Sequence, residues 1–203
     1  MVNRAIILTV IGNAFLAIYV FISRNPLVEP QSVTMPGWVP FIPTLAPLYL
    51  AMLPLSWAMP LLIVSQQRFW ACVRALSWAF AITVVIWILV PTTLARPEIA
   101  PGWWHAPYRV LAALDRPTNI FPCGHILAPV IGTWFLSEEY PRWGLALVLT
   151  TLAGPVVIAV SWQHRPQDIV LGAVIAIGAV LVTRLPPAMR RRDQKLQRPS
   201  STT

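Results

Sequence analysis

Long apolar runs constrain this chain more than any other feature of its sequence. A helix needs about 20 apolar residues to cross a hydrocarbon core of about 30 Å. Six runs approach that length, the fourth being shorter and weaker than the rest, and they cover residues 5–23, 45–65, 75–95, 125–137, 143–161 and 167–183. Because backbone polar groups must be satisfied inside a bilayer, such runs cross it as helices. The sequence therefore predicts an all-α polytopic membrane protein with six transmembrane helices.

The balance of apolar and charged residues excludes an ordinary soluble domain. Hydrophobic residues make up 57% of the 203 residues and charged residues only 11%, whereas a soluble domain carries roughly 25% charged residues. Tryptophan, which favours membrane interfaces, and proline, which membrane helices tolerate, are both abundant. We interpret residues 1–184 as one six-helix transmembrane domain and residues 185–203 as a basic tail.

Basic residues in the loops predict the orientation of these helices. With the N-terminus in the cytoplasm, ten of the 15 Lys and Arg residues lie on the cytoplasmic side and five on the other, as the positive-inside rule requires. We expect a bacterial inner-membrane protein with both termini in the cytoplasm. The basic run of the tail then attracts anionic lipid headgroups. No nucleic-acid partner is expected, because this charge adjoins a membrane exit.

Ionisable residues gather on the opposite, outward side of the predicted bundle. Five stand out there, in the 96–124 loop and at the starts of the fourth and sixth runs: Arg109, Arg116, His125, His164 and Asp168. Ionisable residues at membrane level indicate a functional site, although each could also mark a membrane interface. His164 and Asp168 are four residues apart, which places them on one face if both are helical. A carboxylate beside a histidine is typical of an activated nucleophile or base.

Two guanidinium groups at a spacing of seven residues suit a phosphate ligand. Arg109 and Arg116 offer permanent positive charge and several fixed hydrogen-bond donors. The alternative interpretation is a surface amphipathic helix with one basic side. No convincing cluster of metal ligands is visible in the sequence, so neither a metal nor another cofactor is expected.

Three stretches in this order resemble the motifs of the type 2 phosphatidic acid phosphatase superfamily, which read K-x6-R-P, P-S-G-H and S-R-x5-H-x3-D. The first is Arg109-x6-Arg116-Pro117 here, with Arg in place of Lys. The second is residues 122–125, PCGH, with Cys in place of Ser, and the third keeps only His164-x3-Asp168. The segment VPFIPTLAPLYL before the second run also looks like the I-P-F-x-P segment of the inositolphosphorylceramide synthase-like branch.

The resemblance implies a metal-independent mechanism through a phosphohistidine. His164 would attack the phosphorus, Asp168 would orient His164, and His125 would protonate the leaving alcohol as a general acid. Phosphate would be bound by side chains or by the backbone of the motif residues, namely Arg109, Arg116, Cys123, Gly124 and Arg165. Arg165 is included because Ile158 stands where the family has its arginine.

Three functions remain open at this level. The first is a lipid phosphatase that hydrolyses a phosphomonoester or pyrophosphate of a lipid at the outer face. The second is a phosphotransferase that moves a phosphoryl group or phospho-headgroup to an alcohol acceptor. The third is a non-catalytic lipid transporter or assembly subunit that keeps the motif. Release of inorganic phosphate separates the first two, and loss of all activity-linked phenotype on changing His164 argues against the third.

Overall fold

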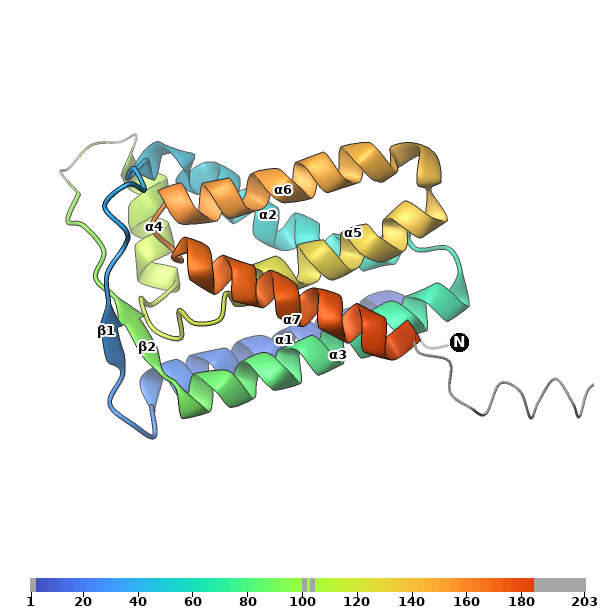
Figure 1. Cartoon of the computed structure of the whole chain (residues 1–203), viewed down its shortest axis with the longest axis horizontal. Coiled ribbons are helices and arrows are strands. Elements are labelled where there is room, and N and C mark those ends of the chain that lie inside the picture. Colours follow the sequence, from blue (N-terminus) through green and yellow to red (C-terminus); the bar gives the residue numbers. More distant parts are fainter. Residues whose placement is uncertain (1–2, 100–101, 103–104, 185–203) are drawn as a thin grey trace, which may run out of the picture.

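The long helices of the protein lie side by side in one bundle, with β1 (Gln31–Val33), β2 (Thr92–Leu94) and α4 (Ala106–Leu114) at one of its ends (Figure 1). The computed structural model describes residues 3–99, 102 and 105–184, so the predicted tail lies outside the described residues. The α-helices are α1 (Arg4–Arg24), α2 (Ala46–Ala58), α3 (Gln66–Leu89), α4 (Ala106–Leu114), α5 (Leu127–Glu139), α6 (Gly144–Val160) and α7 (Pro166–Arg184). Short 3-10 turns extend some of them: η1 (Pro43–Leu45), η2 (Met59–Leu62), η4 (Gly124–Ile126) and η5 (Pro141–Trp143). Two short strands, β1 (Gln31–Val33) and β2 (Thr92–Leu94), pair in parallel.

Five segments are long and apolar enough to cross a membrane. They are Arg4–Arg24, Pro43–Leu62, Gln66–Leu89, Pro141–Val160 and Pro166–Arg184. The prediction of a mostly helical chain is thus confirmed, and the described residues contain five candidate membrane spans where six were predicted. The expected fourth run coincides with η4 and α5, which together cover only residues 124–139. This segment ends early because Pro141 follows it and begins the new turn η5. At the first position of a turn, the missing N–H of proline costs no hydrogen bond.

The outer faces of the helices are apolar, as a lipid environment requires. On α6 and α7 the exposed apolar side chains recur every three or four residues, which marks one continuous face of each helix: Leu145, Leu149, Leu152 and Val156 on α6, and Val170, Val174, Ile177 and Leu181 on α7. A face of this kind in water would be an aggregation hazard. The pattern therefore indicates contact with lipid.

The interior of the bundle lies where α3, α5 and α7 meet. Leu76, Ala79, Ile131 and Ala176 are all buried there in one apolar cluster. Although α5 has only 13 residues, eight of them are buried. It is therefore a central element of the packing.

Polar contacts differ between the two ends of the bundle. At the end that holds Arg4 and Arg184, Arg68 pairs with Glu139 and Arg184 pairs with Glu138. The opposite end carries β1, β2, α4 and the loops between them (Figure 1). The histidines described next belong to this second end.

Candidate functional site

His125 is fixed by the loop that leads into η4. This loop is anchored on three other elements through backbone atoms. The Trp87 indole N–H donates to the Pro122 carbonyl at 3.0 Å, and the Phe121 amide donates to Thr92 Oγ1 at 3.0 Å. The Cys123 amide donates to the Asp168 carbonyl at 2.9 Å. The segment that carries His125 is thus tied to α3, β2 and α7.

A glycine on α7 permits the close approach of that helix to this loop. A Cβ atom at Gly172 would lie 2.4 Å from the carbonyl oxygen of Cys123 and 2.6 Å from the side chain of Ile126. Such distances are far below van der Waals contact. Only glycine therefore allows α7 and η4 to lie at their present separation.

His164 lies in the tight turn between α6 and α7. Trp162 in this turn has a positive φ of 51°, and the Gln163 amide donates to the Ile158 carbonyl at 3.1 Å. The His164 ring is 3% exposed, and its Nδ1 lies 2.7 Å from the carbonyl oxygen of Ile120. Because a carbonyl can only accept, Nδ1 carries the proton and Nε2 keeps a free lone pair.

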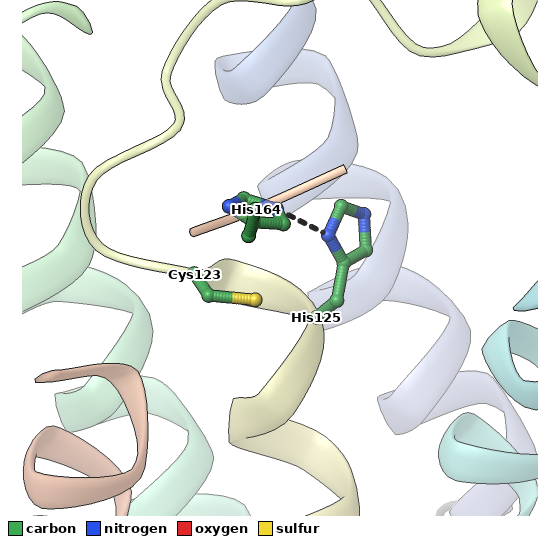
Figure 2. A group of neighbouring side chains, drawn as sticks. All are labelled: Cys123, His125 and His164. Atoms are coloured by element: carbon green, nitrogen blue, oxygen red, sulfur yellow. Dashed lines mark hydrogen bonds between the residues drawn. The ribbon is translucent and has the colours of Figure 1, made fainter. Parts of the chain in front are cut away.

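The structure brings His125 and His164 into direct contact. Nδ1 of His125 lies 2.9 Å from Nε2 of His164 (Figure 2). Burial, followed by the neighbouring His125, lowers the pKa of His164 well below its ordinary value. His164 is therefore neutral at neutral pH, which keeps its Nε2 lone pair available.

Asp168 has a different partner from the one that the H-x3-D spacing suggested. Its carboxylate accepts from the Arg165 guanidinium, with Nη2 at 2.7 Å, and from the Arg165 backbone amide at 2.9 Å. The helix α7 begins at Pro166, so His164 precedes it and Asp168 is its third residue. A carboxylate at that position caps the N-terminus of the helix. The role expected of Asp168, orienting His164, is filled by the Ile120 carbonyl.

A cavity of about 650 Å³ adjoins the histidine pair. One end is polar and holds His125 and His164 together with residues of the 115–120 loop and α1: Tyr19, Asp115, Arg116, Thr118, Asn119 and Ile120. From there an apolar arm runs between α1 and α2, past Leu16 and Leu8 on one wall and Leu53 and Leu61 on the other. The cavity thus joins a polar pocket to a long apolar groove.

Three hydrogen-bonding groups of residues that line this cavity are buried without a protein partner. They are the Tyr49 hydroxyl, Thr118 Oγ1 and Asn119 Nδ2. Asn119 is 2% exposed and has a positive φ of 56°, a conformation that asparagine tolerates better than most residues. Buried polar groups in proteins nearly always have a partner. These three groups are therefore hydrogen-bonding capacity, next to the cavity, that the protein itself leaves unused.

The polar end also contains a network that the sequence patterns did not reveal. The Tyr19 hydroxyl donates to the Asp115 carboxylate at 2.5 Å. Arg96 forms an ion pair with the same carboxylate at 3.3 Å, and its side chain is only 8% exposed. These residues come from α1, the loop after β2 and the loop after α4, so no local spacing connects them.

The remaining predicted phosphate ligands divide into two groups. Arg116 and Gly124 line the cavity. Arg109 is exposed on α4, Arg165 is occupied by Asp168, and none of Arg109, Arg165 and Cys123 lines the cavity. The absent side chain of Gly124 also makes room for the Trp87 ring, which a Cβ atom would meet at 3.0 Å.

Three side chains at the site could hold a metal ion together. The ligand atoms of Cys123, His125 and His164 all lie within 4.8 Å of one another (Figure 2). Sequence inspection did not find this group, because His164 follows the other two by about 40 positions and lies on a different loop.

Comparisons with protein-family models, curated proteins and solved structures found nothing that matches this chain. What the site can do must therefore be argued from its own geometry.

Proposed function

We propose that this protein is a membrane-embedded lipid phosphatase that hydrolyses a phosphomonoester or pyrophosphate of a lipid through a phosphohistidine. The observation that carries the proposal is the contact between His125 Nδ1 and His164 Nε2 at 2.9 Å, at the polar end of a largely apolar cavity. A nucleophile and a proton donor must both reach one phosphoryl group. Two histidines in contact, with a free cavity beside them, meet that requirement.

His164 is the nucleophile in this proposal. Its Nδ1 proton is held by the Ile120 carbonyl at 2.7 Å, which leaves the Nε2 lone pair free. Nε2 forms a bond to phosphorus as the bond from phosphorus to the lipid oxygen breaks. His125, in its protonated form, gives one proton to that oxygen, and the lipid alcohol leaves. The neutral His125 then takes a proton from the attacking water, the bond from Nε2 to phosphorus breaks, and inorganic phosphate leaves.

The hydrogen bond between the two histidines must open during this reaction. A phosphoryl group placed between them needs each reacting nitrogen at about 3 Å from its own partner atom. His125 lines the cavity, so its ring has space on that side into which it can turn. The edge of the Tyr49 ring packs against His125, with centroids 5.4 Å apart, and guides that movement.

Residues that line the cavity supply positive charge and hydrogen-bond donors for the phosphoryl oxygens in this proposal. Arg116 supplies positive charge there. Asn119 Nδ2 and the hydroxyl groups of Thr118 and Tyr49 are buried donors without protein partners. Preorganised donors of this kind stabilise developing charge best in a water-poor site.

The apolar arm of the cavity supports a lipid substrate. It is lined along α1 from Tyr19 to Ala5, a helical stretch of about 21 Å at 1.5 Å per residue. That length exceeds one leaflet of a hydrocarbon core of about 30 Å. A chain lying between α1 and α2 would place its headgroup phosphate at the histidine pair.

In this proposal the chain crosses the membrane six times, and the histidine site faces outward. Both ends of the described chain lie at one end of the bundle, opposite β1, β2 and α4 (Figure 1). The elements η4 and α5 together span about 26 Å, close to the membrane thickness. Together with the basic bias of the loops, this arrangement supports the proposal that both termini lie in the cytoplasm of a bacterial cell. Asn25→Cys, at the far end of α1, should then react with an impermeant thiol reagent in intact cells.

A panel of lipid phosphates and lipid pyrophosphates tests the function directly. Purified protein should release inorganic phosphate from at least one of them, and His164→Ala should abolish the release. His105→Ala is the matched control, because His105 does not line the cavity. New phospholipid in place of free phosphate, formed when an alcohol acceptor is added, would identify a phosphotransferase. If no lipid gives a product, the result would reject both catalytic functions and favour the non-catalytic transporter or assembly subunit.

A further inference from the structure

We propose that Cys123, His125 and His164 form a binding site for Zn²⁺. The sequence predicted no metal, but the folded chain gathers one sulfur and two nitrogens from separate loops. Thiolate and imidazole are the ligands that Zn²⁺ prefers, whereas Mg²⁺ and Ca²⁺ prefer oxygen. One Cys and two His ligands plus an open position are a recognised zinc arrangement.

The distances fit after a small adjustment of side chains. With Zn–N bonds of about 2.0–2.1 Å and a Zn–S bond of about 2.3 Å, tetrahedral ligand atoms stand roughly 3.3–3.6 Å apart. In this structure the three atoms lie within 4.8 Å of one another, and the two nitrogens are 2.9 Å apart. The sulfur must move toward the nitrogens by about 1 Å and the two nitrogens must move slightly apart for all three to reach these tetrahedral separations.

The surroundings of the three ligands match those of a built metal site. A metal-binding histidine usually donates its second N–H to a carbonyl or carboxylate. His164 does so, through Nδ1 to the Ile120 carbonyl at 2.7 Å, which aims Nε2 at the cluster. The Cys123 amide is held by the Asp168 carbonyl, and Cys123 is fully buried. Both histidines line the cavity, which gives the ion a route in and an open fourth position.

Binding of Zn²⁺ has a consequence that rests on the proposed function. The ion takes the Nε2 lone pair of His164, the same pair that would attack phosphorus, and Cys123 releases its thiol proton to solvent. Metal-bound protein should therefore be inactive as a phosphatase until the metal is removed. Cys123 stands where the P-S-G-H motif has serine, and its thiolate makes this site possible.

Metal binding can be measured without any assay of turnover. Full-length protein in detergent, stripped with a chelator, is titrated with Co²⁺ and followed by absorption. One equivalent should give visible bands of tetrahedral cobalt and a near-ultraviolet thiolate-to-cobalt band, both lost on adding Zn²⁺. The cysteine of α3 supplies the control, because Cys72→Ser should keep the thiolate band and Cys123→Ser should lose it. Cys123→Ser should also weaken Zn²⁺ binding by more than about tenfold, the least effect of losing even a supporting partner.

The outcomes separate this proposal from the proposed function. Absence of a tetrahedral cobalt spectrum in the wild-type protein would overturn the metal site, whatever the activity. A thiolate band that survives in Cys123→Ser would overturn it as well, since Cys72 would then be the ligand. If the Cys123→Ser protein is unfolded, His125→Gln provides the second test and should lose the tetrahedral spectrum. A stoichiometric cobalt site in a protein that shows no phosphatase activity even after the metal is removed would support the metal site and reject the lipid phosphatase.

Discussion

Replacing Asp168 by asparagine distinguishes most clearly between two roles of this residue. The structure pairs Asp168 with Arg165, whereas the sequence pattern predicted that it orients His164. The carboxylate is fully buried and pairs with the Arg165 guanidinium, whose side chain is 14% exposed. Breaking a buried ion pair by removing one partner costs about 3–5 kcal/mol. Asparagine keeps one acceptor oxygen and Arg165 keeps some access to water, so we expect a loss of about 2–4 kcal/mol in the free energy of unfolding. For a domain of this size that corresponds to a fall of roughly 5–12 °C in Tm.

The assay combines thermal unfolding in detergent with turnover measured well below both transitions. Asp168→Asn should lower Tm but keep turnover within about tenfold of wild type, because the Ile120 carbonyl holds the His164 tautomer. The double variant Arg165→Met with Asp168→Asn should recover part of the lost Tm, since no charge is then left buried alone. An unchanged Tm with turnover as low as in His164→Ala would refute this reasoning and give Asp168 the role of orienting His164.

Three further predictions follow from the site. His125→Ala should slow hydrolysis of an alkyl phosphate by about 10²–10⁴-fold but p-nitrophenyl phosphate far less, because that leaving group needs no proton; equal losses would exclude His125 as the acid. Gly172→Ala should force α7 and η4 apart, since its Cβ would lie 2.4 Å from the Cys123 carbonyl, and lower both Tm and turnover; wild-type values would contradict the close approach of these elements. In metal-free protein, the nucleophile should stay active as pH falls through about 6.5, because the lowered pKa of His164 keeps its ring neutral and its Nε2 lone pair free; a loss of turnover with its midpoint at or above pH 6.5 would contradict that assignment.

Much of the helical framework could be predicted because apolar length is a local property. Five of the six predicted runs correspond to the candidate spans, and the remaining one, the fourth, coincides with the shorter η4 and α5. The same sequence pattern placed His125 and His164 at the start of helical segments on one side of the bundle. Two loops that open helices at one end of a bundle can bring their residues together, and here they do so at 2.9 Å.

Helix boundaries explain why other predicted contacts differ. The seven-residue spacing of Arg109 and Arg116 places both on one face only if a helix continues through them. The helix α4 ends at Leu114, and Asp115 is extended with ψ of 105°, so Arg116 turns toward the cavity and Arg109 stays exposed. In the same way, His164 precedes the first residue of α7 and so does not share a helical face with Asp168.

Long-range polar contacts could not be predicted from spacing at all. Arg96 and Tyr19 meet Asp115 from segments that are 19 and 96 positions away in the chain. The Tyr49 hydroxyl and Asn119 Nδ2 reach the cavity through the packing of α2 and the loop before η4. Such contacts depend on how helices pack, which a periodic pattern does not specify.

Trapping the phosphorylated protein tests the central claim most directly. The full-length protein is mixed briefly with a lipid phosphate labelled in its phosphoryl group, quenched in alkali, which preserves phosphohistidine, and digested for mass spectrometry. The account predicts an acid-labile phosphoryl group on His164, absent from His164→Ala and still present on His105→Ala. Turnover that proceeds with no phosphoryl group on His164, or a label on any other residue, would contradict it.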